Sequence, residues 1–415
     1  MNRQAFIGAY PLFFLDNMDD MRKTLILLFL FVSVCLFARQ HVTVIISLDG
    51  YRWDYPLMYD TPFLDSLAHR GVSAVMRPSF PSKTFPNHYT LATGLVPDHH
   101  GIIANRFYDV FSERTYSIGD KVTGKDGSFY GGEPIWLTAK RQGIKVGVVY
   151  WPGSDVAIQG QYPDYYKDYA QKPLLTYPQR LAEVERLLTL PDSLRPQLVM
   201  VYFDEPDHCG HVYGPASRPT RRAVEELDSL LNDFYIRLRA LPAGKDINFI
   251  VTSDHGMVPT SSERIIRLSD YLQPEWCERV LADLPTLIFP REGHEDDILR
   301  ALKQVPHLRV WRRKDIPVYL HYGSNPNVAP IVALPDNGWL VTENERVNLG
   351  NHGFDPTNSD LYVPFRAEGP DFKRGYVRQT LFDNTCIYPL LAYLLGIEPA
   401  FCDGDISQIS DLLAR

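Results

Sequence analysis

The sequence predicts an α/β fold, a doubly wound and mainly parallel sheet flanked by helices, for most of its 415 residues. Apolar runs that suit strands buried on both faces recur along the chain, and segments of helical spacing separate them. Such alternation is typical of parallel sheets, whose strands are joined by crossover helices. The composition, 45% hydrophobic and 22% charged, is that of an ordinary globular protein. A net charge of −8 without a Lys/Arg block argues against a nucleic-acid groove.

The N-terminus has the pattern of an export signal. Two basic residues precede the apolar run TLILLFLFVSVCLFA at 24–38, which is too short to span a bilayer comfortably. We therefore expect a signal region at 1–38, with the signal peptide at 21–38 after an over-long start, and a mature domain at 39–415. The expected location is periplasmic or extracellular, with a membrane anchor as the alternative.

Four cysteines remain after such a signal is removed. An exported protein can pair them, and four cysteines allow three connectivities that the sequence does not separate. Closeness in sequence favours a pair between Cys386 and Cys402 over pairs with Cys209 or Cys277. So few cysteines in so long a chain indicate that the hydrophobic core, and not disulfides, holds the fold.

The first strand and helix follow the signal region directly. HVTVIISLDG at 41–50 is an apolar run that delivers Asp49 at its end, and the segment 61–71 has helical spacing. Within 79–109, two prolines bracket a Ser-Lys-Thr turn before a short helix. A hydroxyl at a helix N-terminus lies where N–H groups and the helix dipole favour an anion. Thr84 is therefore either a nucleophile for an anionic substrate or only a helix cap.

The rest of the chain continues the alternation. The expected helices are 132–143, 175–190, 220–241 and 387–397, and the expected strands are 145–151, 197–203 and 247–257. The loop at 151–171 is rich in aromatic rings, which could stack on a planar ligand but more often only pack a long loop. At about 270–330 the pattern changes and predicts a small α+β inserted subdomain, or cap, before the chain returns through 330–341.

Carboxylates and imidazoles follow several of the predicted strands, at the edge where open α/β sheets bind ligands. Asp207 and His211 are four residues apart, but a capping Asp and a surface His would give the same pattern. SLDG at 47–50, SDHG at 253–256 and NHGFD at 351–355 strengthen the signal. The candidate ligands are Asp49, Asp207, His211, Asp254, His255 and His352, with the Thr84 hydroxyl in addition. This mixture suits zinc-like cations and predicts a two-metal centre for phosphoryl transfer.

From about residue 42 to the C-terminus, the chain resembles the nucleotide pyrophosphatase/phosphodiesterases of the alkaline-phosphatase superfamily. The motifs that carry the resemblance are LDGYR (48–52), PSKTFPNHYTLATGLVPDHHGIIAN (81–105), GEPIW (132–136), WPGSDV (151–156), EPDHCGH (205–211), SDHGM (253–257) and NHGFD (351–355). The resemblance implies an alkaline-phosphatase-like fold and a phosphodiesterase catalytic domain over 39–415. It also implies two zinc ions per chain, small-molecule nucleotide substrates and no obligate protein partner.

The resemblance also implies a role for each site residue. Thr84 would be the nucleophile that forms a covalent nucleotidyl intermediate, and Asn105 would donate a hydrogen bond to the phosphate. One zinc would be held by Asp207, His211 and His352, and the other by Asp49, Asp254 and His255 with the Thr84 oxygen. The residues implied for substrate binding are Phe85 and Tyr169, which would enclose the base, and Trp151 and Asp155, which would line or support the pocket.

Three functions remain open at this point. The preference implied by the resemblance is for nucleoside 5′-phosphodiester or pyrophosphate bonds, as in nucleoside triphosphates and dinucleotides. The alternatives are a lysophospholipase C-type or phosphomonoesterase activity at the same centre, and an inactive binding protein. The chain departs from the common family pattern at Pro356, where the family has Asn, so the loop beside His352 is the part of the site that the resemblance describes least well.

Overall fold

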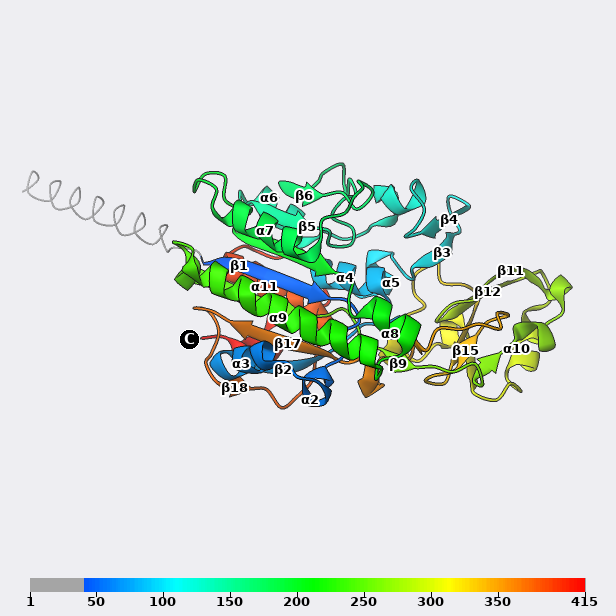
Figure 1. Ribbon diagram of the computed structural model, residues 1–415. Coiled ribbons are helices and arrows are strands. Elements are labelled where there is room, and N and C mark those ends of the chain that lie inside the picture. Colours follow the sequence, from blue (N-terminus) through cyan, green and yellow to red (C-terminus); the bar gives the residue numbers. More distant parts are fainter. Residues whose placement is uncertain (1–40, 415) are drawn as a thin grey trace, which may run out of the picture. The chain divides into compact units, whose positions relative to one another are not determined.

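The structure is a computed structural model, which describes residues 41–414 (Figure 1). The predicted signal region at 1–38 lies outside the described residues. Among the helices between residues 41 and 414, none combines the length and the apolarity that crossing a membrane requires.

A nine-stranded sheet forms the centre of the fold, in the order β18-β2-β17-β8-β1-β7-β5-β6, with β19 also paired to β2. β1 pairs in parallel with β7 and β8, and β5 with β7 and β6, whereas β17 runs antiparallel to β2 and β8. The strands are β1 (Val42–Leu48), β2 (Val72–Arg77), β5 (Val146–Val149), β6 (Tyr165–Lys167), β7 (Leu198–Phe203), β8 (Ile247–Thr252), β17 (Val363–Glu368), β18 (Tyr376–Val377) and β19 (Phe382–Asp383). The predicted mainly parallel α/β fold is confirmed.

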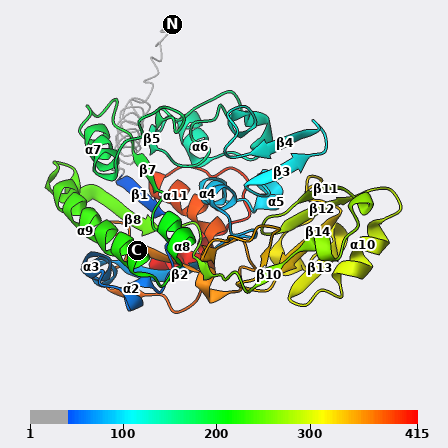
Figure 2. The same ribbon diagram turned by 45° about the vertical axis from the view of Figure 1, so that its right-hand side comes forward.

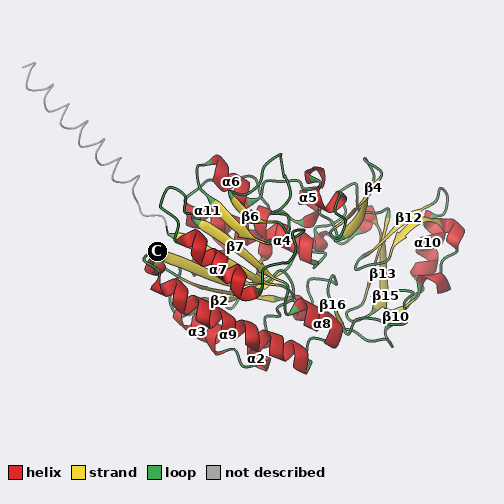
Figure 3. Cartoon of the chain, turned by 45° about the horizontal axis from the view of Figure 1, so that its top comes forward, coloured by secondary structure: helices red, strands yellow, loops and turns green. Residues whose placement is uncertain are grey.

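Helices cover both faces of this sheet, as the buried pattern of β1 requires (Figure 3). Val44 and Ile46 belong to one hydrophobic cluster, and Ile45 between them belongs to another, because successive strand residues point to opposite faces. The first cluster includes residues of α3 (Pro62–Arg70), α7 (Tyr177–Leu188) and α9 (Arg218–Ala240). The second includes residues of α4 (Thr84–Thr93), α6 (Ile135–Arg141) and α11 (Ile387–Leu395).

A second sheet, antiparallel and in the order β11-β12-β14-β13, follows later in the chain and lies beside α10 (Figure 2). Its elements are β11 (Cys277–Leu281), β12 (Thr286–Pro290), α10 (Glu295–Leu302), β13 (Leu308–Arg312) and β14 (Ile331–Pro335). Ile288, Ile298 and Ile331 belong to a separate hydrophobic cluster beneath it. The sheet extends past residue 330, because β14 pairs with β12 and β13. That the segment at about 270–330 is an inserted subdomain stays a prediction.

Short elements connect these layers. They are α2 (Tyr55–Met58), α5 (Pro97–His100), α8 (Asp207–Tyr213), β3 (Arg106–Asp109), β4 (Arg114–Ser117), β9 (Val258–Pro259), β10 (Ile265–Ile266), β15 (Leu340–Val341) and β16 (Gly350–Asn351).

The cysteine pair favoured by sequence proximity is wrong, since all four cysteines within residues 41–414 are free. The Cys386 thiol instead donates toward the Asp405 carbonyl at 3.6 Å, and the Cys402 thiol toward the Gly404 carbonyl at 3.4 Å. Each sulfur therefore has a backbone carbonyl partner in the loop that follows α11.

Candidate active site

Three neighbouring parallel strands deliver the acidic residues of the site. Asp49 follows β1 directly, Asp254 lies two residues after the end of β8, and Asp207 begins the short helix α8 after β7. Because β7, β1 and β8 are adjacent and parallel, their carboxyl ends meet at one edge of the sheet. One turn of α8 then brings His211 to the same side as Asp207, since residues four apart are neighbours on a helix.

The six predicted ligands form two groups of three. Asp207, His211 and His352 make up one group, and Asp49, Asp254 and His255 make up the other. In each group, the atoms that could bind a metal all lie within 4.8 Å of one another. The second group is fully buried, whereas the first is partly open. The family resemblance implied the same three residues for each ion. The structure brings the six residues together although they are spread over positions 49 to 352 of the sequence.

The three histidines have the same orientation. In each ring Nδ1 lies within hydrogen-bond distance of a backbone carbonyl, so the neutral imidazole donates there and leaves Nε2 as a metal-binding lone pair. The acceptors are Gly350 for His211 at 2.8 Å, Gly256 for His255 at 2.9 Å and Ser82 for His352 at 2.8 Å. Burial lowers the pKa of both His255 and His352 well below the ordinary value, which favours this neutral form.

The carboxylates face these ring nitrogens at short distances. One oxygen each of Asp49, Asp207 and Asp254 has no hydrogen-bond partner among residues 41–414. The unpartnered Asp254 Oδ2 lies 3.0 Å from His255 Nε2, and the unpartnered Asp49 Oδ1 lies 3.4 Å from it. Two acceptors at such distances repel each other unless a cation binds both. The donor set therefore fits a divalent metal.

The charges of these carboxylates lead to the same conclusion. Burial, and then the neighbouring charges of Asp254 and Asp207, raise the pKa of Asp49 well above its ordinary value. Burial, and then the charge of Asp207, also raise the pKa of Asp254 well above its ordinary value. Buried like charges are costly unless something compensates them, and bound cations do so.

Thr84 is the first residue of α4, and Lys83 occupies the capping position before it. Thr84 is therefore not the N-cap residue of α4. Its Oγ1 lies 3.2 Å from His255 Nε2. Asn105 is close by, because its side-chain oxygen accepts a hydrogen bond from the Phe85 N–H at 3.2 Å. The amide nitrogen of Asn105 is then the group that can donate to an anion.

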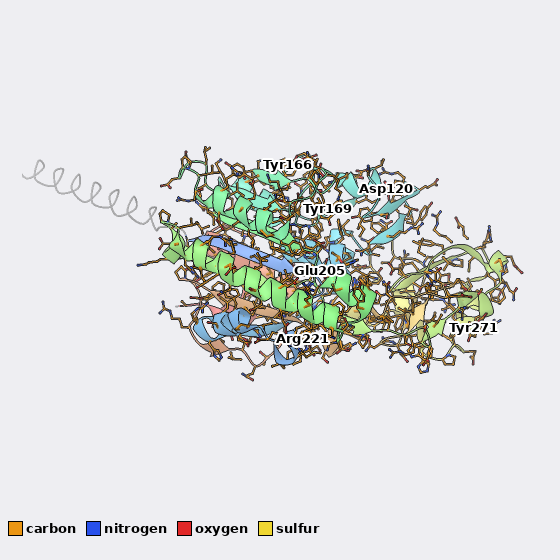
Figure 4. The ribbon with its side chains drawn as sticks, viewed as in Figure 1. Asp120, Tyr166, Tyr169, Glu205, Arg221 and Tyr271 are labelled. Atoms are coloured by element: carbon orange, nitrogen blue, oxygen red, sulfur yellow. The ribbon has the colours of Figure 1, made fainter. Side chains whose placement is uncertain are left out.

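A cavity of about 530 Å³ opens beside Thr84, Asp49 and Asp207. All four residues predicted for substrate binding contribute to its wall, and these are Phe85, Trp151, Asp155 and Tyr169. Trp151 is buried and its indole N–H donates to the His88 carbonyl at 3.0 Å, so its place is fixed. Tyr169 is partly exposed, and Figure 4 labels it together with Tyr166, another exposed ring of the same loop.

Among the cavity residues that the sequence analysis did not predict, Lys125 and Tyr202 bond to predicted site residues. Lys125 lines the cavity and forms ion pairs with Asp155, which also lines it, and with Asp168. A lone lysine in a polar loop gives no signal that could have identified it. Tyr202 donates to Asp49 Oδ2 at 2.6 Å. Its position at the end of the buried strand β7, among aliphatic residues, is a signal that could have been used.

A family model and individual relatives with known sequences identify the same protein family. The family model described as type I phosphodiesterase/nucleotide pyrophosphatase matches residues 43–355. Human ectonucleotide pyrophosphatase/phosphodiesterase family member 5 is 33% identical over 379 residues, which cover 90% of this chain and 78% of that protein. The bis(5′-adenosyl)-triphosphatase of Xenopus laevis is 33% identical over 378 residues, which cover 90% of this chain and 81% of that protein.

A solved structure adds the three-dimensional comparison. An inactive threonine-to-alanine variant of murine ectonucleotide pyrophosphatase/phosphodiesterase 5, in complex with AMP, superposes with a TM-score of 0.85. The match is 32% identical and covers 90% of this chain and 100% of that chain.

Proposed function

Because the chain belongs to the type I phosphodiesterase/nucleotide pyrophosphatase family, we propose that it hydrolyses nucleoside 5′-phosphodiester or pyrophosphate bonds and releases nucleoside 5′-monophosphates. The observation that carries the proposal is the meeting of Thr84, Asp49 and Asp207 on the wall of a cavity that also contains Phe85 and Tyr169. A nucleophile and an ion site thus border a space suited to a nucleoside.

Two zinc ions per chain are part of the proposal. Asp207, His211 and His352 would hold one, and Asp49, Asp254 and His255 would hold the other with the Thr84 oxygen. When bound, zinc ions favour the deprotonated form of a nucleophile and stabilise negative charge that develops on phosphoryl oxygens. The unpartnered carboxylate oxygens and the shared orientation of the histidines support this assignment.

We propose that Thr84 supplies the nucleophilic oxygen. Its Oγ1 forms a bond to the phosphorus that carries the nucleoside 5′ oxygen, and the bond from phosphorus to the leaving oxygen breaks with its electron pair. The hydroxyl proton is lost to solvent. Water then cleaves the threonine–phosphate bond, which restores the hydroxyl and releases the 5′-monophosphate. The inactive threonine variant of the murine relative supports this role.

The remaining site residues bind and orient the substrate in this proposal. The Asn105 amide donates to a non-bridging phosphate oxygen while its carbonyl is held by the Phe85 N–H. Phe85 and Tyr169 enclose the base. The AMP complex of one relative and the dinucleotide named for another support a nucleotide substrate. The export predicted for residues 1–38 belongs to the proposal as well.

A substrate panel tests the proposal. Metal-replete protein is assayed with p-nitrophenyl thymidine 5′-monophosphate, p-nitrophenyl phosphate and p-nitrophenylphosphorylcholine. The expected result is the highest kcat/KM on the first compound, because the aromatic cavity binds its nucleoside. A preference for either of the others would replace the nucleotide proposal with a monoesterase or choline-phosphate activity. No turnover of any of them would favour an inactive binding protein.

A further inference from the structure

The loop that carries His352 contains a buried carboxylate, that of Asp355. This carboxylate is buried and accepts hydrogen bonds at both oxygens. Its Oδ1 accepts from the N–H of Thr357 at 3.0 Å and from the Thr357 hydroxyl at 2.8 Å. These two bonds fix the turn at 355–357, which includes the position where this chain has Pro356.

The other oxygen of Asp355 is bound by one residue of the second sheet and by one residue of the chain that follows β13. Arg309 of β13 donates to Asp355 Oδ2 at 2.8 Å, and the hydroxyl of Tyr319 donates to the same oxygen at 2.7 Å. Burial would raise the pKa of Asp355, but the bonds from Arg309, Tyr319 and Thr357 outweigh it and hold that pKa below its ordinary value. The carboxylate is therefore charged at neutral pH, and charge-assisted bonds of this kind are the stronger ones.

The loop also meets the segment before the nucleophile. The His352 ring donates to the Ser82 carbonyl at 2.8 Å, and the Gly353 N–H donates to the Ser82 hydroxyl at 3.0 Å. His352 Nε2 lies 3.1 Å from His211 Nε2 and 3.5 Å from Asp207 Oδ1. A small shift of the loop would thus move one ligand of this group directly. Asp49, Asp254 and His255 lie outside the loop, and only His255 contacts the moved ring, through stacking at 3.6 Å.

We propose that Arg309 and Tyr319 are positioning residues, which hold the Asp355 carboxylate and thereby keep His352 facing Asp207 and His211. The inference rests on the proposed two-zinc function. It makes the position of one metal ligand depend on β13 and on the chain that follows it. Neither residue lines the cavity beside Thr84, so neither is expected to touch the nucleoside. Partners that orient a metal ligand typically change metal affinity or activity by about 10–100-fold when they are lost.

The test compares Arg309→Met and Tyr319→Phe, singly and together, with Arg312→Met as the matched control. Arg312 is on the same strand, but its ion pairs are with Glu295 and Asp296 of α10. Zinc content and affinity are measured by titration with a chelator, together with kcat, KM for p-nitrophenyl thymidine 5′-monophosphate, and Tm. The wild-type protein is measured first, because its failure to bind zinc or to cleave would reject the proposed function itself.

For the double variant we expect one of the two zinc ions to bind about tenfold or more weakly, and the other to be affected much less. The kcat should fall, KM should change little, and excess zinc should restore kcat. Tyr319→Phe alone removes one hydroxyl and should show a smaller loss at the same single ion. Arg312→Met should match the wild type. Wild-type affinity for both ions in the double variant would overturn the inference, and so would equal loss of both ions in step with a lower Tm.

Discussion

At the scale of single residues, the tyrosines of the loop at 151–171 differ in their surroundings. Tyr169 lines the cavity beside Thr84, and its ring meets Tyr150 edge to face at 5.6 Å. Tyr166 stacks on Tyr162 at 4.8 Å, is similarly exposed, and is absent from the cavity wall (Figure 4). The composition of the loop does not predict which tyrosine lines the cavity, because that depends on the direction in which each side chain points.

This difference predicts the effect of removing each ring. Tyr169→Ala should raise KM for p-nitrophenyl thymidine 5′-monophosphate by about tenfold, because stacking on a base contributes ~1–3 kcal/mol. The kcat should change little, since the contact is made equally in the ground and transition states. Steady-state kinetics check it, with Tyr166→Ala as the control. Equal effects of the two substitutions would remove Tyr169 from the nucleotide site.

The individual ligands show what sequence patterns can predict. Asp49, Asp207 and Asp254 follow strands that are recognisable from their apolar runs, so their convergence could be predicted from the sheet alone. His352 follows no strand of the main sheet, and its place in the group with Asp207 depended on the family resemblance. Lys125 could not be predicted, because its ion pairs with Asp155 and Asp168 depend on how two loops fold back on each other.

At the scale of elements, the turn after β1 is where the fold and the site constrain each other most closely. Gly50 has a φ of +68°, and a Cβ added there would lie 2.8 Å from the Asp207 Cα. Glycine accommodates both the left-handed backbone and the close approach of α8. Gly143 has a φ of +80° but has nothing within 4 Å of an added Cβ.

The two glycines make a matched pair for measurement. Gly143→Ala should lower the free energy of unfolding by about 1 kcal/mol, the usual order for a non-glycine residue at positive φ. Gly50→Ala should lower it further and should also weaken zinc binding, because Asp207 must move. Urea denaturation and zinc titration check both effects. If Gly50→Ala behaved like Gly143→Ala in both measurements, the close contact between the turn and α8 would not matter for the site.

The elements themselves were predicted to different extents. The long amphipathic helix expected at 220–241 is α9 at Arg218–Ala240, because its apolar spacing is regular and Ser217 caps its start. The order of strands in the sheet was not predicted. β17 lies between β2 and β8 and runs antiparallel to both, although it comes far later in the chain, and local periodicity carries no information on such pairing.

In the molecule as a whole, segments that are distant in sequence meet at the site and bring negatively charged carboxylates to it. Asp49 and Asp254 are buried and Asp207 is partly exposed beside them, and the charges of Asp254 and Asp207 raise the pKa of Asp49 in addition to the effect of burial. A cation bound by the folded chain would remove this repulsion. The stability of the molecule should therefore depend on its metals.

Metal removal tests that dependence. A ligand that binds only the folded state at 100 times its Kd stabilises that state by about 2.7 kcal/mol. Dialysis against a chelator should therefore lower the free energy of unfolding by roughly this amount for each zinc ion, relative to protein kept at that zinc concentration. Urea denaturation measures the loss, and zinc added back should restore the stability. Identical unfolding curves with and without zinc would show that the two groups of ligands do not hold metal.

In the proposed reaction, Thr84 forms a covalent bond to the substrate phosphorus beside two zinc ions. The most direct measurement combines zinc content with single-turnover cleavage of p-nitrophenyl thymidine 5′-monophosphate, for the wild type and for Thr84→Ala. We expect two zinc ions per chain in both proteins and release of p-nitrophenol by the wild type only, because the variant lacks the nucleophilic oxygen but keeps the six Asp and His ligands. Substantial p-nitrophenol release by zinc-loaded Thr84→Ala would contradict this expectation.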